Sequence, residues 1–118
     1  MITYLKQSDD SVIAELTDRT HLICETQDML DVIANVSYNG HNKLIIYEEN
    51  LDPKFFDLKT KFAGDVLQKI SNYRFRLAIV GDFSKYRSKS LNDFIWECNR
   101  GKMVCFVSTQ PEAIEKLS

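Results

Sequence analysis

Two apolar segments separated by a long stretch with helical spacing form the clearest pattern in this chain. Residues 43–47 and residues 77–80 are almost uninterrupted runs of apolar side chains, as in strands that are buried on both faces of a sheet. In the stretch between them, residues 51–73, apolar side chains recur at the spacing of a helix. This order predicts a strand, a crossover helix and a second strand parallel to the first.

The crossover segment has a clear start signal. Asp52 is a good helix-capping residue, and Pro53 suits the first position of a helix. The residues that follow supply a broad apolar face for burial. The segment is either one helix from Pro53 onward, or a short turn followed by a main helix that starts near Thr60.

The flanking segments extend this unit into a larger sheet. Residues 2–5 and 12–16 are rich in strand-forming side chains and are separated by a polar cluster, so they predict a hairpin. Residues 21–24 predict a third short strand or an extended segment, and residues 103–107 predict the last strand.

Three further helices follow from apolar spacing and capping residues. The first is expected to start with Thr26 as its cap. Ser90 with Asp93, and Thr109 with Glu112, have the spacing of capping boxes for the second and third helices. The predicted fold is a single α/β domain over residues 1–118, in which N-terminal antiparallel strands join a parallel βαβαβα sheet with helices packed on it.

Composition narrows the class of protein. With 118 residues, of which 44% are hydrophobic, the chain can fill one core. No apolar run approaches the roughly 20 residues needed to cross a bilayer, and the first residues lack the layout of a signal peptide, so we expect a cytoplasmic protein with no membrane partner. The three cysteines have no metal-binding spacing, and we predict neither a metal nor a cofactor.

The net charge of −2 hides a strong asymmetry along the chain. Residues 1–58 carry 4 basic and 11 acidic side chains, a balance of −7, whereas residues 59–118 carry 11 basic and 6 acidic side chains, a balance of +5. Such a charge distribution suits a protein partner or a homo-oligomer. It is not the overall basic balance of a nucleic-acid-binding protein.

Candidate chemistry gathers where the parallel strands end. Residues 48–60, 81–89 and 108–109 follow three predicted strands, and the carboxyl ends of parallel strands lie at one edge of a sheet. We call these three segments the carboxyl rim. The residues that we single out there as an interaction or ligand site are Asp57, Lys59, Thr60, Asp82, Ser84, Lys85, Arg87, Ser88 and Lys89.

Two kinds of chemistry are open to these residues. The cations of residues 84–89 precede a helix N-terminus, a setting that favours an anionic or nucleotide-like small molecule, although the glycines of a phosphate-binding loop are absent. Asp57 and Asp82 are either a carboxylate pair or local caps, and Thr60 or Ser84 is a possible phosphoacceptor. Neither histidine is expected near the rim, so no catalytic residue is predicted and the sequence favours a non-enzymatic role.

Two segments of the chain resemble a known family. Residues 55–60 (Phe-Phe-Asp-Leu-Lys-Thr) and residues 77–86 (Leu-Ala-Ile-Val-Gly-Asp-Phe-Ser-Lys-Tyr) look like the bacterial domain-of-unknown-function family 4180, over nearly the whole chain. This resemblance implies no activity.

A looser resemblance is to STAS domains, the fold of anti-anti-sigma factors. It implies a small sheet with helices stacked on one side and a regulatory, protein-binding role. Phe56-Asp57 is similar to the start of the STAS turn, but Leu58 stands where that turn has its phosphoacceptor hydroxyl, and Thr60 is the only hydroxyl nearby. We therefore expect a STAS-like regulatory or interaction module, with an enzyme or binding domain for an anionic ligand as the alternative.

Overall fold

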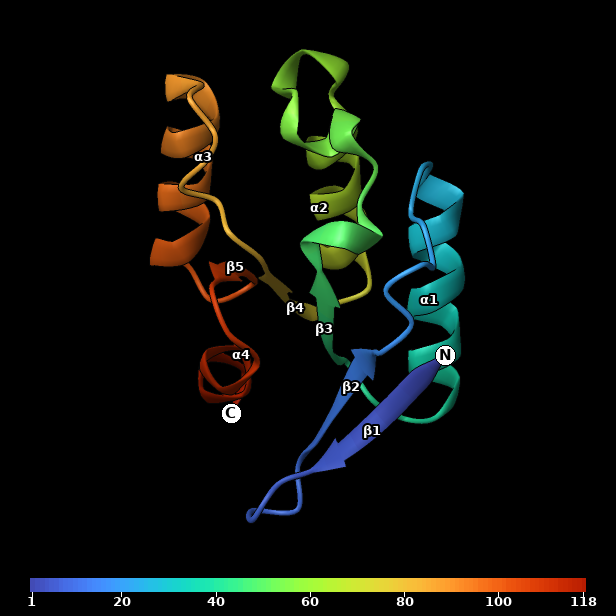
Figure 1. The fold of residues 1–118 in the computed structure, drawn as a ribbon. Helices are drawn as coiled ribbons and strands as arrows, with labels where there is room; N and C mark the ends of the chain where they lie inside the picture. Colours follow the sequence, from blue (N-terminus) through green and yellow to red (C-terminus); the bar gives the residue numbers. More distant parts are fainter.

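A computed structural model describes all 118 residues as a five-stranded sheet with four α-helices (Figure 1). The strands lie side by side in the order of the sequence. β1 and β2 are antiparallel, and β2 to β5 are parallel. The strands are β1 (Ile2–Lys6), β2 (Val12–Leu16), β3 (Lys43–Tyr47), β4 (Arg76–Val80) and β5 (Val104–Val107). The predicted α/β class, with an antiparallel hairpin joined to a parallel sheet, is confirmed.

The helices divide unequally between the two faces of the sheet. α1 (Thr26–Tyr38), α2 (Phe62–Asn72) and α3 (Lys89–Arg100) contribute to the larger hydrophobic core on one face. α4 (Gln110–Leu117) packs against β3, β4 and β5 on the opposite face (Figure 1). The three crossover helices therefore share one side, whereas α4 departs from the one-sided arrangement expected from the STAS resemblance.

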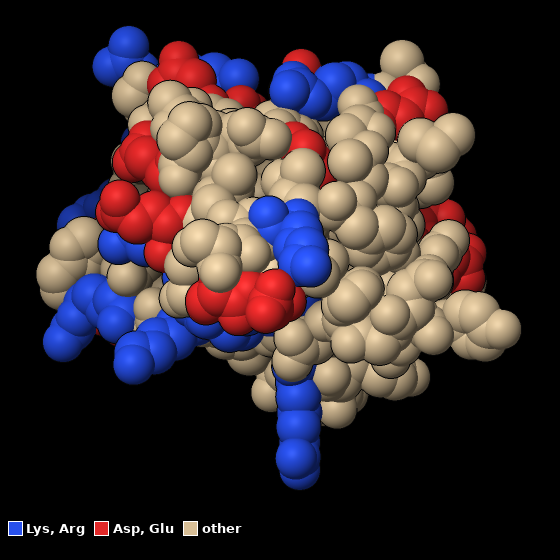
Figure 2. Space-filling view, turned by 90° about the horizontal axis from the view of Figure 1, so that it is seen from below, with Lys and Arg blue, Asp and Glu red and all other residues tan.

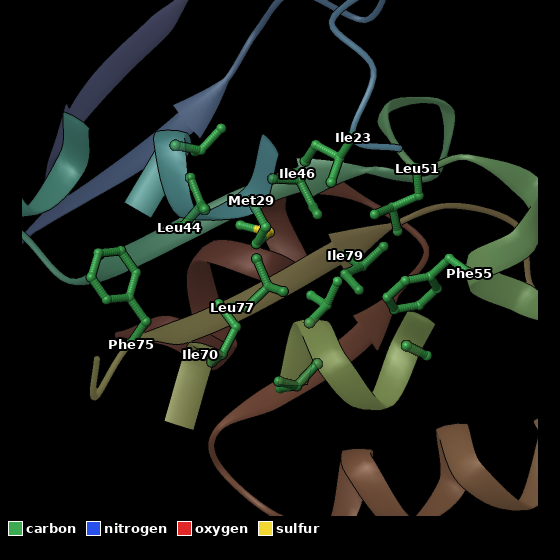
Figure 3. Packing of buried hydrophobic residues seen from close by; sticks show 14 of the residues in the cluster. Ile23, Met29, Leu44, Ile46, Leu51, Phe55, Ile70, Phe75, Leu77 and Ile79 are labelled. Atoms are coloured by element: carbon green, nitrogen blue, oxygen red, sulfur yellow. The ribbon is translucent and has the colours of Figure 1, made fainter. Parts of the chain in front are cut away.

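The main core lies between the central strands and the crossover helices. Figure 3 shows Leu44 and Ile46 of β3 beside Leu77 and Ile79 of β4, with Met29 of α1 over them. All five side chains are fully buried. Burial of one such side chain contributes about 1.5–3 kcal/mol. A shift of one residue would turn these side chains to the other face, so their burial fixes the register of the two central strands.

Of the strand or extended segment expected at residues 21–24, no strand of the sheet forms. Only an isolated bridge, Ile23 with Leu51, forms there. Asn50 explains this local structure, because its side-chain amide donates to the carbonyl oxygens of Asp18 and His21, 2.9 Å away in each case, and holds the segment as a loop. Ile23 is nevertheless fully buried, so the apolar side chains of residues 21–24 indicate packing in the core rather than a strand.

Residues 51–73 form a series of turns and a shorter helix, the second of the two predicted alternatives. Asp52 and Pro53 do start a helix, but it is a short 3-10 helix, Pro53–Phe56, followed by another, Leu58–Thr60. Asp57 caps the second one by accepting from the Lys59 amide at 3.2 Å. α2 begins only at Phe62, after Lys61 takes a left-handed conformation with φ of 66°.

Helix starts were predicted with mixed accuracy. Thr109 caps α4 as expected, through its hydroxyl oxygen and the Glu112 amide. The cap of α3 is Ser88 rather than Ser90, because Ser88 Oγ accepts from the Leu91 amide and the helix starts two residues earlier. α1 is capped by Glu25 instead of Thr26, with the Asp28 carboxylate accepting from the Glu25 amide. No helix has the length and apolar character to cross a membrane.

The charge asymmetry of the sequence is also an asymmetry in space. Because the strands lie in sequence order, the acidic half of the chain forms α1 and β1 to β3, and the basic half forms the opposite side of the molecule. Figure 2 shows several Lys and Arg side chains at the lower left, the side of α3 and α4 in Figure 1, with Asp and Glu side chains among and above them and a largely uncharged surface on the right.

Candidate functional site

The segments of the carboxyl rim meet in the folded protein, and Glu48 joins two of them. One oxygen of its carboxylate accepts from the Asp82 amide at 3.2 Å, and the other accepts from the Tyr86 hydroxyl. The second oxygen also lies 2.8 Å from the Lys85 ammonium. The Gly81 amide donates to the Val107 carbonyl at 2.9 Å, so the end of β5 joins the same rim. The connections after β3, β4 and β5 thus lie together.

Aromatic packing adds a second link between the first two connections. The rings of Phe56 and Tyr86 are stacked, with centroids 4.8 Å apart, and Phe83 lies next to both. Phe56 is buried and Tyr86 is half-buried. Because offset stacking adds about 0.5–1.5 kcal/mol to the area that the rings bury, residues 53–56 are held against the loop that carries Lys85.

A groove runs between these two connections, and we call it the rim groove. Its volume is about 470 Å³, and it is lined by Leu22, Leu51, Pro53, Phe56, Tyr86, Lys85, Glu48 and Glu49. Leu22 is 49% exposed although it is a large apolar side chain. The groove therefore has an apolar floor bordered by charges of both signs.

Two of the predicted cations at the rim already have partners within the chain. Lys85 pairs with Glu48, and Lys89 pairs with Asp93 one turn along α3, at 2.8 Å in each case. The hydrogen bond to Glu48 raises the pKa of Lys85 above its ordinary value. Lys59 and Arg87 are exposed and form no ion pair.

The predicted carboxylates and hydroxyls serve the local turns. Asp82 accepts from the amide and the hydroxyl of Ser84, and the hydroxyl bond lowers the pKa of Asp82. Asp57 caps its own turn, so the two aspartates are local caps. The Thr60 hydroxyl is exposed and lies 2.7 Å from the Lys54 carbonyl oxygen. Ser88 caps α3.

A buried polar cluster beside the rim is absent from the sequence predictions. Glu15 of β2 is only 6% exposed, and its carboxylate accepts from the Tyr47 hydroxyl and from the Gln110 side-chain amide at 3.0 Å. The Arg19 guanidinium lies 3.4 Å from the centre of the Tyr47 ring. The signal in the sequence was Glu15 itself, a charged residue within the strand-forming run of residues 12–16.

This cluster borders a second hollow at the rim, of about 490 Å³, lined mainly by polar residues of the β3, β4 and β5 ends. The polar groups around this hollow already bond to other groups of the chain. Arg19 pairs with Glu49 at 3.4 Å, and Glu112 accepts from the Ser108 and Thr109 hydroxyls at the start of α4. No three His, Cys, Asp or Glu side chains are grouped as metal ligands.

Comparison with known proteins places the chain in a family. A family model described as a domain of unknown function, DUF4180, matches residues 8–117. The chain belongs to the DUF4180 family. Neither the curated proteins nor the solved structures contain a match to it. Membership in DUF4180 confirms the resemblance stated from residues 55–60 and 77–86, and it assigns no activity.

Proposed function

We propose that this DUF4180 chain is a non-enzymatic protein-interaction module that holds a segment of a partner protein in the rim groove. The observation that carries the proposal is the groove itself: an apolar floor, with a half-exposed leucine, between two connections that Glu48 ties together. Apolar pockets bordered by polar groups are typical of the centre of protein interfaces. The expected occupant is an apolar side chain of the partner, flanked by polar or charged residues.

The winding of the sheet supports a binding surface over an enzyme cleft. In doubly wound α/β proteins, the ligand crevice forms where the strand order reverses and neighbouring connections leave toward opposite faces. Here the parallel strands follow one another in a single direction, and their crossover helices share one face. The connections after β3 and β4, which border the rim groove, therefore leave toward the same face, and neighbouring connections diverge only after β4 and β5, where α3 and α4 lie on opposite faces.

The alternative function, binding of an anionic or nucleotide-like molecule, has less support. Of the four cations expected to converge on an anion, Lys85 and Lys89 are each paired with a carboxylate. An anion at Lys85 would have to compete with Glu48, which is mostly buried and already accepts two hydrogen bonds. Arg87 and Lys59 would remain as its main contacts.

The regulatory part of the proposal is electrostatic. Ser84 is exposed and its hydroxyl donates to Asp82, two residues before it. Phosphorylation of Ser84 would add about two negative charges next to Asp82 and would compete with Glu48 for Lys85. A switch of this kind would alter the border of the rim groove directly, which is consistent with the STAS-like role expected from the sequence.

The test compares two exposed apolar residues, one in the groove and one outside it. Leu22 lines the groove, whereas Tyr38, at the end of α1, is 91% exposed and lies away from it. Immobilised wild-type protein, Leu22→Ser and Tyr38→Ser are incubated with lysate of the native host, and the retained proteins are quantified by mass spectrometry. We expect a partner that wild type and Tyr38→Ser retain equally, with a loss of about tenfold for Leu22→Ser. Equal retention by all three proteins, or no retained protein, would overturn the proposal.

A further inference from the structure

The two outer edges of the sheet differ in whether their outward backbone groups have hydrogen-bond partners. At the β5 edge, the side chain of Asn99 on α3 pairs with the backbone of Phe106, accepting from its amide at 2.7 Å and donating to its carbonyl oxygen at 3.2 Å. This contact occupies backbone groups to which a further strand would bind. Natural proteins commonly block an edge strand in such a way. At the β1 edge no comparable contact forms.

The hydrogen bonds of the hairpin identify which β1 groups face outward. Gln7 pairs with Ser11 through its amide, and the Thr17 amide donates to the Met1 carbonyl. Because paired and unpaired residues alternate in an antiparallel ladder, Thr3 and Leu5 bond to β2. The amides and carbonyls of Ile2, Tyr4 and Lys6 therefore point away from the sheet, and no other group in the chain bonds to them.

The surface beside this free edge combines apolar and polar side chains and carries few charges. A hollow of about 380 Å³ lies between β1 and α1 and is lined by apolar side chains such as Met1, Ile2 and Tyr4 and by polar ones that include Asp31 and Asn39. Tyr4 is 36% exposed and Met1 is 79% exposed. β1 carries one charged side chain, Lys6, which pairs with Asp10 in the hairpin turn at 3.5 Å. Protection by charge, a common safeguard of exposed edges, is therefore minimal.

We propose that β1 pairs with β1 of a second copy of this chain. In an antiparallel pairing centred on Tyr4, the two Tyr4 residues face each other, and Ile2 of each copy faces Lys6 of the other. The outward amides and carbonyls of Ile2, Tyr4 and Lys6 then bond across the interface. No like charges are opposed in this register, because the only charged residue of each strand lies opposite an isoleucine.

The difference between the edges also determines the size of the assembly. A contact of β1 with β1 is two-fold symmetric and uses the same surface on both copies. Since Asn99 occupies the outward backbone groups of Phe106 at the β5 edge, further extension of the sheet on that side is disfavoured. The expected product is a closed dimer with one continuous sheet. This inference is independent of the rim groove, which lies at the strand ends.

Wild-type protein alone supplies the first test. Its mass is measured by light scattering over a dilution series, and amide hydrogen exchange of β1 is followed at the highest and lowest concentrations. We expect a concentration-dependent rise toward twice the monomer mass of 13.7 kDa. The Ile2, Tyr4 and Lys6 amides should gain protection as the mass rises, while Thr3 and Leu5 are protected throughout.

A matched pair of variants tests the register. Tyr4→Pro and Tyr4→Ala both remove the ring, but only proline removes the outward amide, and it leaves the bonds to β2 intact. We expect Tyr4→Pro to weaken the dimer at least about tenfold relative to Tyr4→Ala, because two hydrogen bonds across the interface are lost. Circular dichroism checks that both variants fold.

Three results would overturn the proposal. One is a monomer mass at every concentration, with a freely exchanging Tyr4 amide, which would leave the edge open to a different protein. Another is a dimer whose Tyr4 amide exchanges freely, because that dimer uses another surface. The third is equal dimerisation of folded Tyr4→Pro and Tyr4→Ala.

Discussion

Glu48 and Lys85 form an ion pair across two connections that are far apart in the sequence, with the carboxylate oxygen 2.8 Å from the ammonium. The Glu48 side chain is 12% exposed and the Lys85 side chain is 57% exposed. The mostly buried carboxylate also accepts from the Asp82 amide and the Tyr86 hydroxyl. Glu48 therefore links the two connections that border the rim groove.

Replacing Glu48 should destabilise the protein. Glu48→Ala leaves the Tyr86 hydroxyl and the Asp82 amide without their acceptor, and each unsatisfied group costs about 1–3 kcal/mol in proportion to its burial. Its neighbour Glu49 is exposed and pairs only with Arg19, so Glu49→Ala should change stability by less than about 0.5 kcal/mol. Urea unfolding of the two variants measures the contrast, and equal midpoints would contradict the role assigned to Glu48.

Gly81 is expected to tolerate no side chain. A Cβ at this position would lie 2.6 Å from Glu48 Cβ and 2.7 Å from its carboxylate oxygen, so Gly81→Ala would displace Glu48. We expect a loss of about 1–3 kcal/mol. Gly64, within α2, has open space around it, and Gly64→Ala should stabilise the helix by up to about 1 kcal/mol. Thermal unfolding of both variants tests the opposite signs, and a Gly81→Ala protein as stable as wild type would refute the close contact.

Alkaline pH should lower the free energy of unfolding, because the Tyr47 phenol ionises. Burial, together with the hydrogen bond to Glu15, raises the pKa of Tyr47 from its ordinary value of 10 to about 12. The folded protein thus holds the neutral phenol more tightly than the unfolded chain does. The stabilisation that the neutral Tyr47 phenol gives the folded state is complete below about pH 10 and is lost as the pH rises toward about 12.

The comparison of wild type with Tyr47→Phe checks this pH dependence. Denaturant unfolding is measured at neutral pH and between the two pKa values of Tyr47. Over that range, wild type should lose more stability than Tyr47→Phe, which has no phenol to ionise at this position. Parallel pH profiles for the two proteins would show that Tyr47 ionises in the same way in both states.

The sheet could be predicted from the sequence because its signals are local. Residues 43–47 and 77–80 are buried runs, and the polar cluster between residues 5 and 12 marks a hairpin. The sequence left two alternatives for the His21–Cys24 segment, because an apolar run indicates burial, whereas its hydrogen bonds depend on the side chain of Asn50. The break before α2 likewise depends on the conformation of Lys61, which no sequence signal indicates.

The meeting of the rim segments was predictable from the sequence, but of the nine residues singled out there only Lys85 lines the rim groove. The rim follows from the parallel strands, and its segments do meet. Pairing of Lys85 with Glu48 joins residues from different connections, and the Glu15 cluster joins β2, β3 and α4. Such contacts depend on tertiary geometry, which residue types and spacing along one chain do not specify.

The most direct test of the interaction function is photo-cross-linking from inside the rim groove. A photoreactive amino acid is placed at position 22, and in a control protein at position 38, and each is irradiated in cells of the native host. Cross-linked peptides are then identified by mass spectrometry. The account predicts a discrete adduct with a partner protein from position 22 and none from position 38. The same adducts from both positions, or none from position 22, would contradict it.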